Sequence, residues 1–313
     1  MSFFYNIKEL PVFNNAVLTV GTFDGVHQGH KAILQEVVQH AKEVNGESVL
    51  LTFDPHPRKL LFPDQPLGII TPLQQKLQLI TDAGIEHVVV IPFTKEFSEL
   101  SAQEYIENFM VDFFHPHSVV IGYDHRFGHD RKGNIELLRE YAPKYNYEVI
   151  EIPVQLIDEA TVSSTKIRAA ISLGSIEEAA HMLGRNYSIA GTVIGGKKLG
   201  KTIGYPTANI SLNDKDQLIP SIGIYAVRVV WNSHKYDGML SIGHNPTVSD
   251  KKELHIEVNI FDFDAEIYDE TIEIEFVSYM RDEEKFDSIE ELKKQLGMDK
   301  EKALELLKLK SLN

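Results

Sequence analysis

A glycine-rich stretch, GGKKLGKTIGYPTAN (residues 195–209), contains the spacing of a phosphate-binding loop. The residues that match GxxxxGK(S/T) are Gly195, Gly200, Lys201 and Thr202. A P-loop ATPase also needs a helix directly after this motif, because the phosphate rests on the helix N-terminus. Here Gly204 and Pro206 follow, and these residue types cost a helix interior about 1 and about 3 kcal/mol. We therefore favour a glycine loop between two strands, whose amides can form an anion-binding nest, over a P-loop ATPase.

A second stretch, GTFDGVHQGH (residues 21–30), directly follows an apolar run. A turn over residues 21–29 leads His30 into a helix, at a place where amides and the helix dipole favour an anion. His27 and His30 put two imidazoles beside those amides, and Gly29 allows phosphates to approach the backbone. The position predicts a phosphate site. For an arbitrary HxxH pair, capping of a surface helix would be the favoured alternative.

Zinc is a further alternative, because other histidines lie in the same half of the chain. They are His56, His115, His117, His125 and His129. No HExxH helix accompanies them, so we disfavour a histidine metal site. The chain has no cysteine, which excludes disulfides, thiolate nucleophiles and cysteine zinc sites.

Short apolar runs alternate with helical patterns through the first half of the chain. The predicted strands are residues 16–20, 48–53, 87–91, 118–122 and 147–152. Helices fill the gaps: one runs from His30 to Gly46, one opens at Thr71-Pro72, and Ser101 with Glu104 has capping-box spacing for a third. This alternation predicts a Rossmann-like α/β domain with a parallel sheet, whose ligands sit at the ends of the strands.

The period changes to two after a short helix over residues 175–184. The predicted strands are residues 187–194, 225–231, 236–242, 255–261 and 271–279, with no helix between them. They predict an antiparallel β-barrel or sandwich, covered by a C-terminal helix that starts at Ser288 and breaks at Gly297. We predict two domains, residues 1–184 and 185–313.

Acidic side chains outnumber basic ones by 46 to 31, giving a formal net charge of −15. Such a chain repels nucleic acid, so a small phosphorylated ligand must be held locally by amides, a few cations and Mg²⁺. The N-terminus carries Lys8, Glu9 and Pro11 where a signal peptide needs an apolar run, and no run of spanning length occurs. We expect a soluble cytoplasmic protein without a membrane or nucleic-acid partner; the sequence leaves its oligomeric state open.

Three motifs in order resemble the adenylyltransferase half of bacterial bifunctional riboflavin kinase/FAD synthetases: GTFDGVHQGH, FDPHP (residues 53–57) and SSTKIR (residues 163–168). The resemblance implies that His27, His30 and Arg168 act in catalysis on ATP phosphates. It implies further ATP contacts from Gly21, Phe23, Gly29, Ser164 and Thr165. The local chemistry agrees, because Ser163 or Ser164 can cap a helix that begins near Thr165, and Arg168 offers a bidentate guanidinium for the leaving pyrophosphate. Taken alone, the serines would only be a cap and Arg168 a solvated charge.

The glycine stretch, read on to Asn209 and Ile210, resembles the riboflavin kinase signature ending in PTANI. The resemblance implies ATP contacts from Gly195, Gly200, Lys201 and Thr207, and a catalytic glutamate at Glu257. Thr207 and Asn209 lie two apart on an extended segment, so their oxygens can meet one Mg²⁺. The ordinary alternatives are that PTAN is a turn entering a strand and that Glu257 faces water. Flavin contacts are implied for Pro55, Pro57, Asp124, Phe127, Arg281 and Phe286.

The resemblance implies an enzyme that phosphorylates riboflavin and then adenylylates FMN, using MgATP twice, with flavins as substrate and product. Two alternatives stay open: a kinase whose first domain has lost its activity or serves regulation, and a nucleotide- or flavin-binding regulatory module without turnover. Chromatography of riboflavin, FMN and FAD after incubation with ATP and Mg²⁺ would separate the three.

Overall fold

A computed structural model describes residues 2–123, 125–152, 162–196, 200, 203–244 and 254–310 of the 313-residue chain. Its internal contacts divide the chain into two compact units, residues 1–164 and 165–313. The division falls at the first residue of a helix and precedes the predicted boundary at 184. The α/β unit and the barrel unit are described separately below.

The α/β unit contains a six-stranded sheet in which every neighbouring pair is parallel. Its order is β1-β4-β3-β2-β5-β6. The strands are β1 (Ser2–Phe4), β2 (Val17–Val20), β3 (Ser48–Asp54), β4 (His87–Pro92), β5 (Ser118–Gly122) and β6 (Glu148–Ile152). The central strands are buried on both faces, which explains their nearly continuous apolar runs. The Rossmann-like prediction is confirmed, with β1 as an additional edge strand.

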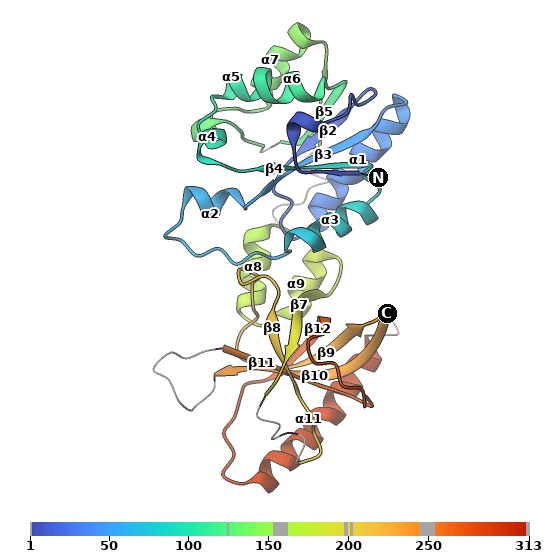
Figure 1. Cartoon of the computed structure of the whole chain (residues 1–313), viewed down its shortest axis with the longest axis vertical. Coiled ribbons are helices and arrows are strands. Elements are labelled where there is room, and N and C mark those ends of the chain that lie inside the picture. The colour runs from blue at the N-terminus through green and yellow to red at the C-terminus, as the bar shows by residue number, and fades with distance from the viewer. Residues whose placement is uncertain are drawn as a thin grey trace. The chain divides into compact units, whose positions relative to one another are not determined.

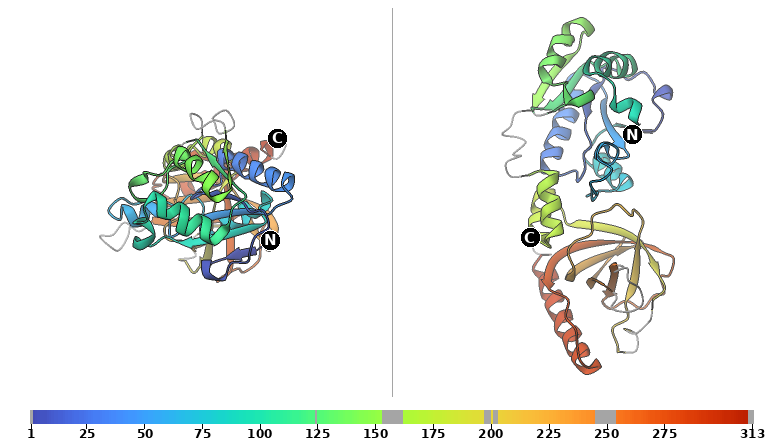
Figure 2. Two further views of the ribbon diagram at one scale, coloured as in Figure 1. Left: turned by 90° about the horizontal axis from the view of Figure 1, so that it is seen from above. Right: turned by 90° about the vertical axis from the view of Figure 1, so that its left-hand side faces the viewer.

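Helices cover both faces of this sheet (Figures 1 and 2). On one face α1 (Gln28–Glu43) and α3 (Leu73–Asp82) pack into one apolar cluster. On the other, η2 (Tyr105–Val111) and α7 (Ile135–Tyr145) pack into a second. The predicted capping box is present at α5 (Ala102–Glu104). Two predicted starts are wrong: α1 begins at Gln28 instead of His30, and α3 begins at Leu73 with Pro72 as its N-cap, in place of Thr71.

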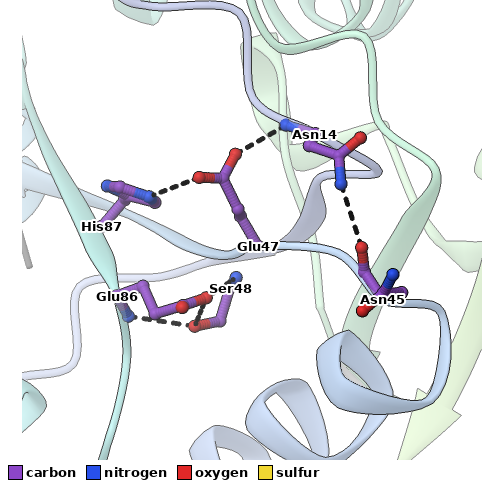
Figure 3. Close-up of polar contacts among 6 residues, drawn as sticks. All are labelled: Asn14, Asn45, Glu47, Ser48, Glu86 and His87. Carbon is purple, nitrogen blue, oxygen red and sulfur yellow. Dashed lines mark hydrogen bonds and ion pairs between the residues drawn. The ribbon is translucent and has the colours of Figure 1, made fainter.

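A network of polar contacts lies at the amino ends of β3 and β4 (Figure 3). The Glu47 carboxylate accepts from the Asn14 amide at 2.6 Å and lies 3.2 Å from His87 Nε2. Ser48 and Glu86 bond to each other through both main chain and side chain. These groups pair with one another at the amino ends of the strands. The predicted motifs lie at the opposite edge of the sheet, after the carboxyl ends of the strands.

The barrel unit is a closed barrel of antiparallel strands in the order β10-β11-β8-β7-β12-β9. The strands are β7 (Tyr187–Ile194), β8 (Ala208–Leu212), β9 (Gly223–Trp231), β10 (His234–His244), β11 (Leu254–Ile260) and β12 (Thr271–Arg281). Two helices, α8 (Ser164–Ser172) and α9 (Ile176–Leu183), precede it. The barrel prediction is confirmed.

The C-terminal helix α11 (Ile289–Leu309) lies along the outside of the barrel (Figure 2). Its Ala303 and Leu307 are buried against Ala226, Met239 and Met280 of the strands. The predicted break at Gly297 is wrong, because the helix runs through it without interruption. Packing along one apolar stripe outweighs the weak helix propensity of one glycine. Among the residues described, no helix combines the length and the hydropathy needed to cross a bilayer.

Candidate active sites

The loop between β2 and α1 is held in a strained conformation by its own buried side chains. Phe23 and Val26 have φ values of 47° and 38°, in the left-handed region that a branched side chain such as valine rarely adopts. Each such residue costs roughly 1–3 kcal/mol. Both side chains are buried in the cluster that holds α1 on the sheet. Packing therefore fixes the backbone of the loop, which also contains Gly21 at the end of β2.

The two histidines lie together at the start of α1. His27 is the N-cap of this helix, and its Nδ1 accepts from the His30 amide at 3.3 Å. The two rings stack with centroids 3.6 Å apart, and the His30 ring lies 5.0 Å from that of Phe23. His27 and Gly29 are buried, while His30 is partly exposed. The structure thus brings the predicted imidazoles to a helix N-terminus and also confirms a capping role for His27.

A buried carboxylate fastens this loop to two distant segments. Asp24 is 2% exposed and accepts from the amides of Ile70 and Thr71, at 3.1 and 3.0 Å. The Asp24 carbonyl accepts from Ser164 Oγ at 2.9 Å. Ser164 is the first residue of α8, so it is not the N-cap, and its hydroxyl holds the loop. Thr165 is exposed and Arg168 partly buried on the same helix.

Sequence reasoning missed a lysine that joins the carboxyl ends of two central strands. Lys76 Nζ donates to Thr52 Oγ1 at 3.0 Å, to the Thr22 carbonyl at 3.2 Å and to the Phe53 carbonyl at 3.5 Å. Burial lowers the pKa of Lys76 to about 8, against the opposing attraction of Asp24 and Asp54. Its signal in the sequence is a lysine between Leu73, Leu77 and Ile80 on the apolar stripe of a helix.

The loop after β3 contains two predicted flavin contacts. The Asp54–Pro55 peptide is cis, and Pro55 is exposed. Pro57 is the first residue of α2 (Pro57–Leu61), which His56 caps by accepting from the Arg58 amide. The proline spacing is therefore explained by a tight turn and a helix start, and a flavin contact there stays a prediction.

The loop after β5 contains the other two flavin contacts predicted for the α/β unit, Asp124 and Phe127. Phe127 is buried in the apolar core, 4.9 Å from the Tyr105 ring, and bridges to Gly133. A Cβ at Gly133 would lie 2.4 Å from the Phe127 ring, so only glycine fits beneath it. Asp124 lies outside the described residues.

In the barrel, the PTAN segment and β11 bring the predicted kinase residues together. Glu257 pairs with Asn209 across the ladder, and Thr207 Oγ1 donates to Glu257 Oε2 at 3.1 Å. Asn259 Nδ2 donates to the Pro206 carbonyl at 2.6 Å and fixes the turn that precedes Thr207. A hydroxyl, an amide and a carboxylate thus meet where β8 begins.

The glycine loop lies against the same residues. A Cβ at Gly196 would fall 2.0 Å from Asn209 Nδ2, and one at Gly200 would fall 2.2 Å from the Tyr205 carbonyl. At Gly200 the neighbouring atom is backbone, so glycine is required for this close approach, whereas at Gly196 it is the end of the Asn209 side chain. Residues 203–207 form a turn and an extended segment, as expected for a loop that is not a P-loop. Gly195 is exposed, and Lys201 lies outside the described residues.

These groups also suit a magnesium ion. Mg²⁺ prefers oxygen ligands and usually takes only one or two from the protein, the rest being water and substrate phosphate. The hydroxyl of Thr207 and the amide oxygen of Asn209 are such donors, on one segment beside a carboxylate. Within the described part of the chain, no three His, Asp or Glu side chains gather as an alternative metal site.

Arg281 and Phe286, the flavin contacts predicted at and after the end of β12, contact other groups of the protein. The Arg281 guanidinium bonds both oxygens of Asp299, at 2.9 and 2.7 Å, and lies 6.0 Å from the Phe286 ring. Asp299 is 3% exposed and accepts also from Gln295. The hydrogen bonds to Asp299 raise the pKa of Arg281 above its ordinary value. Asp299, which the sequence did not single out, therefore anchors Arg281 to α11.

Comparison with known proteins gives matches over both halves of the chain. Residues 10–166 match the family model of FAD synthetase, and residues 183–307 match that of riboflavin kinase. Bifunctional riboflavin kinase/FMN adenylyltransferases are 41% identical in Listeria monocytogenes, over 92% of this chain and 91% of the relative, and 36% identical in Bacillus subtilis, over 92% of each. The protein of that name from Escherichia coli K12 is 32% identical over 97% of this chain and 96% of its own.

A solved structure has the same fold throughout. The crystal structure of a macrolide-efflux protein from Streptococcus pneumoniae matches with a TM-score of 0.87 and 34% identity, covering 96% of this chain and 97% of that one. Its name describes transport, whereas the two family models and the named relatives agree on flavin synthesis. On that agreement, the chain belongs to the family of bifunctional riboflavin kinases/FMN adenylyltransferases.

Proposed function

We propose that this protein converts riboflavin to FMN in its barrel unit and FMN to FAD in its α/β unit, with ATP as the second substrate of both reactions. The observation that carries the proposal is the presence of both family models on one chain, over residues 10–166 and 183–307. We propose domain limits of 1–184 and 185–313 for the two activities.

In the kinase reaction, the 5′-hydroxyl oxygen of the ribityl chain attacks the γ-phosphorus of ATP. The bond between that phosphorus and the bridging oxygen breaks, and ADP leaves. Glu257 is the group that takes the hydroxyl proton, and the Thr207 hydroxyl orients its carboxylate. The amides of Gly195, Gly196 and Gly200 bind phosphate oxygens. Arg281 and Phe286 border the flavin.

Thr207 and Asn209 would hold the magnesium ion that accompanies ATP. When bound, it would neutralise charge on the phosphates.

In the adenylyl transfer, an FMN phosphate oxygen attacks the α-phosphorus of ATP, and pyrophosphate leaves. The nucleophile is already ionised at neutral pH, so catalysis requires alignment and stabilisation of charge, without a general base. His27, His30 and the amides at the start of α1 bind the triphosphate, with Gly21, Phe23 and Gly29 shaping the loop. Ser164, Thr165 and Arg168 complete the site, and Arg168 stabilises the leaving pyrophosphate. Pro55, Pro57, Asp124 and Phe127 contact FMN.

The net charge of −15 supports the absence of a nucleic-acid partner, and consumption of ATP in both steps supports a cytoplasmic location. Purified protein would be incubated with riboflavin, ATP and Mg²⁺, and the flavins resolved by chromatography. The proposal expects FMN first and FAD later. Riboflavin that stays unchanged in a folded preparation would contradict it.

A further inference from the structure

Lys76 occupies a position where helices normally carry an apolar residue. It is 7% exposed, and its neighbours on the same face of α3, Leu77 and Ile80, are buried in the core. Lysine is almost never buried to this extent unless it is paired, because its charge loses hydration. The hydrogen bonds of its ammonium group offset part of a penalty that leucine or methionine would avoid.

The ammonium group of Lys76 joins two loops of the predicted adenylylation site. One partner is the carbonyl of Thr22, in the loop that leads to the histidines. The others are the hydroxyl of Thr52 and the carbonyl of Phe53, directly before the loop that contains Pro55 and Pro57. One cation thus fixes the spacing between a phosphate-binding loop and a flavin-binding loop.

Its charge also suits the position. The charged groups around it are Asp24, in the loop after β2, and Asp54, at the end of β3. Burial outweighs both and lowers the pKa of Lys76 to about 8, so the group is protonated at neutral pH and loses its charge in mildly alkaline solution. A fixed cation bound to the loop that leads to the predicted phosphate-binding histidines is valuable in a chain with a net charge of −15.

We propose that Lys76 is a positioning residue for adenylyl transfer, in which its protonated amine holds the loops after β2 and β3 at the spacing that aligns ATP with FMN. This inference rests on the proposed function of the α/β unit. A lysine that only stabilised the fold would predict a different response, because activity would then follow the folded fraction of the protein at every pH.

The test measures kcat/KM for MgATP in FAD formation from supplied FMN, between pH 7 and pH 9.5. In the wild type, kcat/KM should fall through pH 8 and be about tenfold lower at pH 9 than at pH 7, because it follows the charged fraction of the free enzyme. K76M should be at least tenfold less active at pH 7, with no such alkaline fall, while its formation of FMN from riboflavin stays unchanged. K95M is the matched control, since the Lys95 side chain is 80% exposed, and should behave like the wild type.

K76R keeps the charge above pH 8 and should lose the alkaline fall. A K76M variant with wild-type FAD formation would overturn the inference, as would a wild-type profile that stays flat to pH 9.5. If K76M does not fold, K76R and the wild-type profile decide: an alkaline fall in K76R equal to that of the wild type contradicts the proposal. A wild type that forms no FAD at any pH would instead contradict the proposed function itself.

Discussion

Glu257 differs from other glutamates of the barrel in what its carboxylate contacts. Glu275 is paired with Lys235 at 2.7 Å, and Glu273 accepts from Ser188 at 2.7 Å, as is typical of acidic residues with structural partners. Glu257 instead accepts from the hydroxyl of Thr207, beside Asn209 and the glycine loop. These contacts support its assignment as the base of the kinase reaction.

Glu257→Gln keeps the shape and the hydrogen bond to Thr207 but removes the proton acceptor. General-base assistance contributes about 10²- to 10⁴-fold, so kcat for FMN formation should fall by that factor. FAD formation from supplied FMN should not change. Glu275→Gln, on β12 of the same barrel, is the control and should keep full kinase activity. Normal FMN formation by the Glu257→Gln variant would remove the assignment.

His30→Ala removes one of the stacked imidazoles at the start of α1 and, with it, a donor to the triphosphate. We expect FAD formation to be abolished within the sensitivity of the chromatographic assay, while riboflavin is still converted to FMN. His129→Ala is a suitable control, because the His129 side chain is 53% exposed in the same unit. Retained adenylylation in His30→Ala would show that this pair has a capping role alone.

At the scale of elements, one ion pair attaches α11 to the end of β12. Asp299 is buried and binds the Arg281 guanidinium through both oxygens. Removing one partner of such a pair leaves an uncompensated charge. The predicted flavin-side arginine thus depends on a helix that is distant from it in sequence.

Asp299→Ala should lower the free energy of unfolding of the barrel by about 3 kcal/mol or more. Trp231, the single tryptophan of the chain, lies in β9 and reports this unit by its fluorescence during denaturant unfolding. Asp264→Ala, at an exposed carboxylate, is the control and should change little. Equal midpoints for the two variants would contradict the anchoring role.

Much of the fold could be predicted from local patterns. The parallel strands are continuous apolar runs, whereas buried and exposed residues alternate along the barrel strands. Each pattern therefore predicted the type of sheet to which its strands belong. The three-residue β1 carries no comparable signal and gains stability by pairing with β4 and by packing of Phe4 against the core. The break expected at Gly297 did not account for packing of α11 on the barrel.

The predicted site is clearest where a motif is local. HxGH and PTAN could be recognised because their residues are adjacent in sequence. Lys76 and Asp299 could not be found in this way, because their roles depend on partners at the ends of strands that are far away in the chain. Their common signal is a charged residue on the buried stripe of a helix, which becomes interpretable only once the partners are known.

At the scale of the whole molecule, the chain carries two candidate sites, one for each proposed activity. Each is built from main-chain amides and a few polar side chains, in a chain whose net charge opposes polyphosphates. The central claim is that the two sites act in sequence and are independent in their chemistry. FMN is the product of one and the substrate of the other.

The most direct test mixes two variants that each lack one activity. With riboflavin, ATP and Mg²⁺, His30→Ala alone should stop at FMN, and Glu257→Gln alone should leave nearly all riboflavin unconverted. The equimolar mixture should form FAD, because FMN released by the first variant is adenylylated by the second. Formation of FAD by His30→Ala alone, or its absence from the mixture when FMN accumulates, would contradict the account.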